Sequence, residues 1–197
     1  MLLTRPYFRE RAVTYARRWA LSRNPLFADF TGKGGDCTNF VSQCVLAGCC
    51  TENFTPTFGW YYISRDNRAP AFSGVEYFYN FMTGYGGYPP NLTRVGPLGI
   101  EVGRGRVEPG DVVQLYDRGD DFYHTLLVSE VTPDDILVCA HSDDALDRPL
   151  SSYRLAAGQR FIHIQAALVE YMDDDCFERL ITGGGNFAPE VENPPDM

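Results

Sequence analysis

The segment Gly34-Gly35-Asp36-Cys37-Thr38-Asn39-Phe40-Val41-Ser42-Gln43 decides how the rest of this sequence is interpreted. Its two glycines predict a tight turn, and apolar residues then recur at helical spacing. The pattern predicts a helix from about Cys37 to Ala47 that ends at Gly48. A cysteine is therefore expected in the first turn of a helix, directly after a loop.

Cys37 at this position is a candidate nucleophile. The first N–H groups of a helix are unpaired and carry a partial positive charge, which favours a thiolate and can hold an oxyanion during acyl transfer. The alternative is a buried cysteine that acts as a small hydrophobic residue. Asp36 is expected to cap the helix, because Asp is a favoured N-cap residue. Its alternative role is to orient a substrate amine.

The chain has three histidines, and two of them stand where neighbouring strands are expected to meet. His124 opens one apolar strand and His141 closes the next, so both fall near the same end of a sheet. This arrangement predicts His124 as a base and His141 as the polar group that orients it, with Asp143 as the alternative third residue. Taken singly, each could instead be a partly exposed histidine at a strand end. His163 is expected to be a structural sheet residue.

Composition narrows the class of protein. The 197 residues are 44% hydrophobic and 14% aromatic, with a formal net charge of −9. A chain of this size builds one domain with a hydrophobic core, and its acidity disfavours nucleic acid as a partner. No transmembrane segment, signal peptide, zinc-type cysteine spacing or cofactor motif is recognised. The six cysteines are expected to be mostly reduced thiols.

Helical patterns come first in the sequence and strand patterns second, which predicts an α+β fold with an antiparallel sheet. A helix is expected from about Thr4–Pro6 to Asn24-Pro25, and another over Val75–Met82. Strands are expected over four segments: Val112–Tyr116, Tyr123–Val131, Ile136–His141 and Gln159–Ile164. The segment Ala166–Ile181 is expected to form a helix or a strand followed by a helix.

Some aromatic residues lie outside any regular pattern. Trp60, Tyr61 and Tyr123 are candidates for a substrate groove, although loop-rich packing would explain most such residues equally well. A single domain is predicted over residues 1–182. Residues 183–197 are rich in Gly, Pro and acidic residues, which predicts a flexible acidic tail.

Several blocks of the sequence resemble the bacterial "putative amidase domain" family over roughly residues 7 to 165. The most specific block is Gly34–Gln43. The others, in order, are Pro109-Gly110-Asp111-Val112-Val113-Gln114, His124-Thr125, Ala140-His141-Ser142-Asp143 and Phe161-Ile162-His163-Ile164.

That family is similar to papain-like cysteine peptidases of the CHAP and NlpC kind. The resemblance implies a nucleophile helix packed on an antiparallel sheet, with Cys37 as nucleophile, His124 as base and His141 as third residue. It also implies a metal-independent hydrolase that acts on amide bonds of bacterial peptidoglycan, with a peptide or muropeptide as its partner. The family implies an extracellular or cell-wall location. Because no signal peptide is recognised in the sequence, a cytoplasmic location is left open.

Two other functions fit the same residues. The first is a non-catalytic module that binds a peptide or a glycan in a groove of the same fold. The second is transamidation, in which an amine replaces water as the acceptor of the acyl group. An intact Cys and His set favours an enzyme over a binding module, because binding alone requires no thiol and base.

Overall fold

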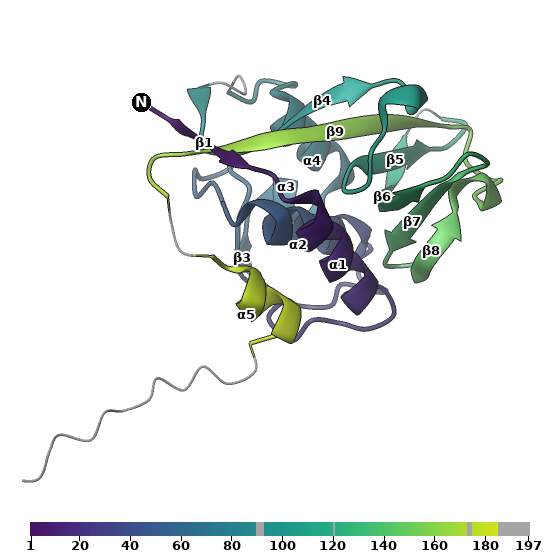
Figure 1. The fold of residues 1–197 in the computed structure, drawn as a ribbon, viewed down its shortest axis with the longest axis horizontal. Helices are drawn as coiled ribbons and strands as arrows, with labels where there is room; N and C mark the ends of the chain where they lie inside the picture. The colour runs from purple at the N-terminus through teal and green to yellow at the C-terminus, as the bar shows by residue number, and fades with distance from the viewer. Residues whose placement is uncertain (90–92, 120, 173–174, 185–197) are drawn as a thin grey trace, which may run out of the picture.

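The computed structural model describes residues 1–89, 93–119, 121–172 and 175–184. These residues form an α+β fold built on a seven-stranded antiparallel sheet (Figure 1). Six strands follow the order β1-β9-β5-β6-β7-β8, and β4 also pairs with β9. The predicted α+β class with an antiparallel sheet is confirmed.

The long strand β9 organises the sheet, because it pairs with β1, β4 and β5. The strands of this sheet are β1 (Leu3–Pro6), β4 (Gly96–Val102), β5 (Val112–Tyr116), β6 (Phe122–Val131), β7 (Ile136–Ala140), β8 (Ala145–Pro149) and β9 (Gly158–Val169). A separate small sheet consists of β2 (Tyr62–Ser64) and β3 (Asn67–Arg68).

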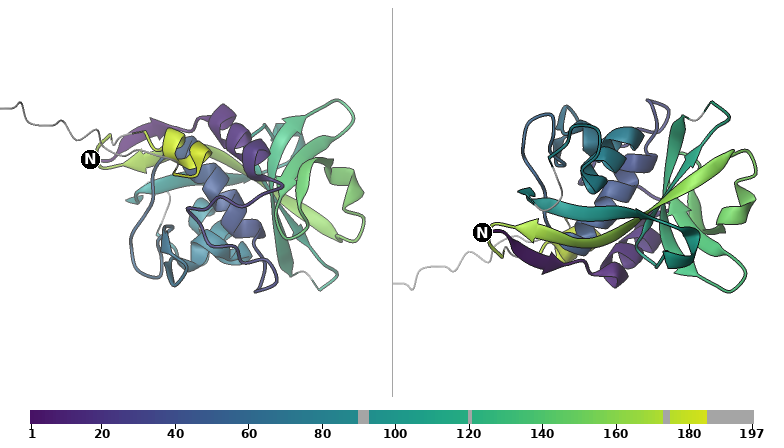
Figure 2. Two further views of the ribbon diagram at one scale, coloured as in Figure 1. Left: turned by 90° about the horizontal axis from the view of Figure 1, so that it is seen from below. Right: turned by 90° about the horizontal axis from the view of Figure 1, so that it is seen from above.

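The helices lie beside this sheet. They are α1 (Arg9–Trp19), α2 (Cys37–Cys49), α3 (Pro70–Ser73), α4 (Val75–Thr83) and α5 (Phe177–Thr182), and two 3-10 turns are η2 (Arg104–Arg106) and η3 (Leu150–Ser152). Figure 2 shows the helices gathered at one end of the molecule and the curled strands β5 to β8 at the other. No helix of the described residues is long and apolar enough to cross a membrane.

The first helix starts later than predicted. Residues Leu3–Pro6 form an edge strand on β9 instead of the first helical turn, with Pro6 opposite Ala166. An edge strand tolerates a proline because one side of it needs no N–H donor. The Arg5 side chain fixes this strand further by donating a 2.8 Å hydrogen bond to the Cys50 carbonyl.

The cysteine helix α2 also runs two residues beyond its predicted end. Gly48 lies inside the helix, where the Tyr7 ring packs so closely that a Cβ would come 2.3 Å from the ring. Cys50 ends the helix in a left-handed conformation, with φ of +47°. Glycine at position 48 therefore allows this close contact with Tyr7 and does not end the helix.

Helix α2 is surrounded by the protein on all sides, and all thirteen of its residues are buried. It packs against α1, α3 and β6. The sheet has a core on each face because side chains alternate along its strands. Leu127 of β6 belongs to the core under the helices, whereas Leu126 and Val128 belong to a second core inside the curled strands.

The expectation of mostly reduced cysteines is confirmed for four of the six, whereas the other two form a disulfide. Cys50 and Cys176 form a disulfide across 126 residues of sequence, and the other four cysteines are free and buried. The bond joins the end of α2 to the start of α5. Sequence spacing could not identify this pair, because the two residues meet only through the tertiary fold. The predicted flexible tail falls almost entirely on residues 185–197, outside the described residues.

Candidate active site

The turn before α2 presents Cys37 to a pocket. Gly34 and Gly35 have φ of +98° and +101°, a region that side chains other than glycine rarely adopt. This backbone brings the chain sharply into α2, so that its first residue, Cys37, faces a pocket of about 530 Å³. The pocket is also lined by Tyr123, His124, Ser142, Asp143, Arg148, Tyr153 and Arg154.

Cys37 lines this pocket but is buried, with 6% of the residue exposed. Burial raises the pKa of the thiol, although hydrogen bonds from the Thr125 backbone and from Thr38 act in the opposite direction. The sequence predicted a thiol that readily ionises at a helix N-terminus. In the structure the loss of solvation is the larger effect.

His124, at the start of β6, lines the same pocket and is 7% exposed. Its Nε2 atom has no hydrogen-bond partner among the described residues. Burial lowers the pKa of His124 to about 4, while nearby Asp143 acts to raise it and Arg148 to lower it. Because the pKa of the Cys37 thiol is raised and that of His124 is about 4, both side chains are uncharged at neutral pH. Within the described part of the chain, no hydrogen bond joins them.

His141 lies elsewhere, behind the turn that carries Cys37. Its Nδ1 atom is 2.7 Å from Asp36 Oδ2, its Nε2 atom is 2.9 Å from the Trp19 carbonyl oxygen, and its ring stacks on Phe40. Both ring nitrogens are therefore engaged by groups other than His124. The charged residues that act on His124 are instead Asp143 and Arg148, which form a salt bridge with each other.

Asp36 occupies the N-cap position, but its side chain makes no capping hydrogen bond to the helix. The carboxylate is 1% exposed and faces inward. It accepts hydrogen bonds from the Phe30 N–H at 3.1 Å and the Asn39 amide at 2.8 Å, in addition to the contact with His141. The predicted capping role is wrong, because His141 and Asn39 draw the carboxylate away from the helix N–H groups.

The three aromatic candidates for a groove lie in different places. Tyr123 lines the pocket of Cys37 and is 46% exposed. Trp60 is completely buried, where its ring packs on Phe72 and its Nε1–H donates to Ser42. Tyr61 packs against Phe54 and is not among the residues that line the pocket. The prediction for Trp60 is wrong, because this side chain fills the core.

Sequence reasoning missed several residues of the pocket. Arg148 lies on β8, a strand that the pattern did not predict, and Tyr153 and Arg154 follow in the loop before β9. Ser142 carried a weak signal, because it stands between His141 and Asp143 in a block that resembles the family.

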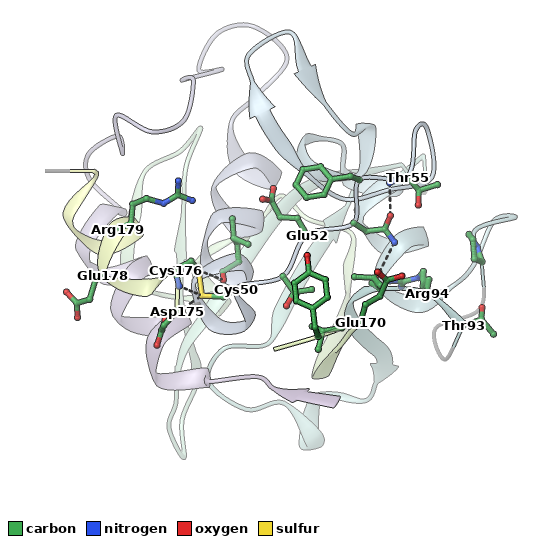
Figure 3. Close-up of a pocket in the computed structure, with 18 residues that line it drawn as sticks. Cys50, Glu52, Thr55, Thr93, Arg94, Glu170, Asp175, Cys176, Glu178 and Arg179 are labelled. Carbon is green, nitrogen blue, oxygen red and sulfur yellow. Dashed lines mark hydrogen bonds between the residues drawn. A yellow bond between two sulfur atoms is a disulfide. The ribbon is translucent and has the colours of Figure 1, made fainter. Parts of the chain in front are cut away.

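A larger cavity of about 1290 Å³ lies elsewhere in the molecule, at the end of α2 that is remote from Cys37 (Figure 3). Its walls include Glu52, Glu170, Arg179 and the Cys50–Cys176 disulfide. Neither Cys37 nor a histidine is among the described residues that line it, so these residues offer no cysteine nucleophile with an adjacent histidine. Among the residues that the structure describes, no group of three His, Cys, Asp or Glu side chains is arranged to hold a metal ion.

Comparison with known proteins matches the chain to a protein family. The model of the family described as "Putative amidase domain" matches residues 6–164, which include Cys37, His124 and the other described residues that line their pocket. No curated protein and no solved structure gives a significant match. The family match supports an amidase, and therefore a hydrolase, activity. Because the match covers most of the chain, the protein belongs to the "Putative amidase domain" family.

Proposed function

We propose that this protein is a cysteine amidase that cleaves amide bonds through an acyl-enzyme at Cys37. The observation that carries the proposal is that Cys37 and His124, 87 residues apart in the sequence, line one pocket. Cys37 opens helix α2 and His124 lies near the start of strand β6, which is the arrangement expected of a papain-like enzyme of the CHAP and NlpC kind. The family match supports the amidase part of the proposal.

The pKa directions suggest how the reaction begins. The thiol pKa is raised and the His124 pKa is about 4, so the resting pair is uncharged at neutral pH. In this mechanism the thiol proton passes to His124 while the sulfur attacks the carbonyl carbon. The C–N bond then breaks, His124 gives the proton to the departing amine, and a thioester remains on Cys37. Water activated by His124 hydrolyses the thioester.

Two groups of the pocket would assist these steps. The backbone N–H of Cys37 lies at the start of a helix and would stabilise the oxyanion that forms on the substrate carbonyl. Asp143 is the better candidate for the residue that supports protonated His124, because its negative charge already raises the pKa of that histidine. His141 is less suited to that role, since both of its nitrogens are engaged elsewhere.

We further propose a peptide amide of bacterial peptidoglycan as the substrate. The support is the resemblance to enzymes of the CHAP and NlpC kind and the character of the pocket. Arg154 is exposed at its rim and Arg148 is half-buried beside Asp143, so carboxylate-bearing peptides find basic partners in an otherwise acidic protein.

The test is digestion of purified peptidoglycan fragments, followed by mass spectrometry. We expect the wild type to release peptides and Cys37→Ala to release none. Cys139→Ala is the matched control, because Cys139 is also free and buried but does not line the pocket, and it should retain activity. Equal cleavage by wild type and Cys37→Ala would overturn the proposal. Fragments that bind without cleavage would favour a binding module, and products that incorporate an added amine would favour transamidation.

A further inference from the structure

A buried ion pair lies directly behind the proposed nucleophile. His141 and Asp36 are each 1% exposed, and their Nδ1 and Oδ2 atoms are 2.7 Å apart. Asp36 directly precedes Cys37 in the sequence. Contacts that fix the position of Asp36 therefore also fix the position of the proposed nucleophile. Nothing in the proposed chemistry assigns a task to this pair.

The hydrogen-bond partners of His141 determine its protonation. A carbonyl oxygen only accepts, so the 2.9 Å contact with the Trp19 carbonyl requires a proton on Nε2. A carboxylate also only accepts, so the contact with Asp36 requires a proton on Nδ1. Both requirements are met together only by an imidazolium ion, which the stacked Phe40 ring, at 3.9 Å between centroids, also favours.

The surroundings of Asp36 keep it ionised. Its Oδ1 atom accepts from the Phe30 N–H and the Asn39 amide, and the Arg23 Nε atom lies 3.6 Å from Oδ2. All these groups are donors or cations, and donors favour the charged form of a carboxyl group. The alternative, in which a protonated Asp36 donates to a neutral His141, lacks such support.

We propose that His141 is a positioning residue whose imidazolium form clamps Asp36 and thereby fixes Cys37 for attack. The inference rests on the proposed role of Cys37. The clamp has two points, because the Asp36 N–H also donates to the Ser142 hydroxyl at 2.6 Å. Two successive residues after β7 thus hold both the carboxylate and the backbone of the residue before the nucleophile.

Other charged and titratable groups around the pair come from three elements. From the segment after α1, Arg23 forms salt bridges with Asp29 and Asp144 as well as with Asp36. From α1 and α2, Tyr15 and Cys37 each interact electrostatically with Asp36. The clamp is therefore one cation and one anion inside a wider network of charges, in which the His141 ring bridges the Asp36 carboxylate and the Trp19 carbonyl.

The first test measures the protonation of His141 by ¹⁵N NMR of the imidazole nitrogens at pH 7. The sample is the Cys37→Ala protein, so the result does not depend on activity. We expect both nitrogens of His141 to carry protons. His124 serves as an internal reference for a neutral ring, since its pKa is about 4. A His141 ring with one unprotonated nitrogen would overturn the proposal.

The second test asks whether the clamp affects Cys37. Asp36→Asn keeps the shape of the side chain but removes its charge, and His141→Gln removes the cation. We expect the rate of iodoacetamide alkylation at Cys37 to fall by roughly tenfold to a hundredfold in either variant, because small displacements of a reacting group have effects of this size. Near-UV circular dichroism checks that each variant is folded. If His141→Gln does not fold, the labelling rate of Asp36→Asn alone tests the clamp.

His163→Gln is the matched control. His163 also pairs with a buried aspartate, through a 3.0 Å contact between Nδ1 and Asp111 Oδ2, but it lies on β9 and is not among the described residues that line the pocket of Cys37. Its replacement should leave Cys37 labelling unchanged. Unchanged labelling in Asp36→Asn would overturn the positioning role even if His141 is doubly protonated. Amidase activity retained by Cys37→Ala would instead refute the proposed function and leave the NMR result standing.

Discussion

At the scale of single residues, burial favours the uncharged form of both Cys37 and His124. It raises the pKa of the thiol and lowers that of the imidazole, so each residue keeps its uncharged form. A helix N-terminus alone would favour the thiolate. The difference shows why a favourable position in the sequence does not determine the state of a nucleophile, which depends on the side chains that exclude water from it.

The shifted pKa of His124 predicts a loss of stability in acid. In the unfolded chain His124 has a pKa of 6.5, whereas in the folded protein its pKa is about 4. Stability from this residue is therefore complete above pH 6.5 and is lost as the pH falls toward 4. The loss amounts to about 3 kcal/mol.

This contribution is measured as the difference between wild type and His124→Gln in urea unfolding at pH 7 and at pH 4.5. Glutamine is similar in size and does not titrate, so its free energy of unfolding should depend less on pH. Parallel pH dependence of the two proteins would contradict the buried, neutral state of His124.

The burial of Trp60 gives a second prediction. Replacement by alanine removes a fully buried ring and its hydrogen bond to Ser42, so we expect the free energy of unfolding to fall by about 3–5 kcal/mol. Tyr61→Ala, next to it but only partly buried, should cost about 1 kcal/mol. Urea denaturation compares the stabilities of the two variants. If Trp60→Ala unfolded at the same urea concentration as the wild type, Trp60 would not be a core residue.

The sequence predicts Cys37 and His124 as candidate site residues because each stands at a boundary between a turn and an apolar pattern, and the structure places both in one pocket. It did not identify the pairing of Asp36 with His141. The two residues are 105 positions apart, and their contact depends on how α2 packs against β7. A periodic pattern shows which face of an element is buried, but not which polar groups meet across the interface.

At the scale of elements, regular segments were predicted best. Strand β5 has the predicted bounds, α4 differs from its prediction by one residue, and β6 begins one residue early. Strands β4 and β8 were missed, because β4 contains Gly96, Pro97 and Gly99, which are poor strand formers, and β8 contains charged residues and a proline. Pairing with β9 and β7 overrides these local preferences.

The disulfide connects two of these elements and predicts sensitivity to reductant. It holds α5 against the end of α2 and closes a loop of 126 residues. Reduction should lower the free energy of unfolding by about 2–4 kcal/mol. The double variant Cys50→Ser/Cys176→Ser should show the same loss without reductant and no further change with it. Thermal unfolding with and without dithiothreitol measures this, and equal melting temperatures for the wild type would contradict it.

At the scale of the whole molecule, the two cores share one sheet. Strand β6 contributes Leu127 to the core under the helices and Leu126 to the core inside the curled strands. Helix α5 lies beyond the family match, yet Leu180 is buried and its carbonyl accepts a hydrogen bond from Asn24. We therefore expect a single domain.

A single domain predicts one cooperative unfolding transition. Tryptophan fluorescence reports the helical side through Trp19 and Trp60, and far-UV circular dichroism reports the molecule as a whole. The two signals should change at the same urea concentration. Separate midpoints would show that the curled strands and the helical part unfold independently.

The central claim is that Cys37 is a nucleophile that uses His124 as its base. The most direct measurement is the rate of iodoacetamide alkylation at each free cysteine, between pH 6 and pH 9, in wild type and His124→Gln. The account predicts that Cys37 reacts faster than Cys44, Cys49 and Cys139, and that His124→Gln slows it by roughly tenfold or more at pH 7, where a buried thiol depends on a neighbouring base. Equal rates at Cys37 in the two proteins would contradict the account.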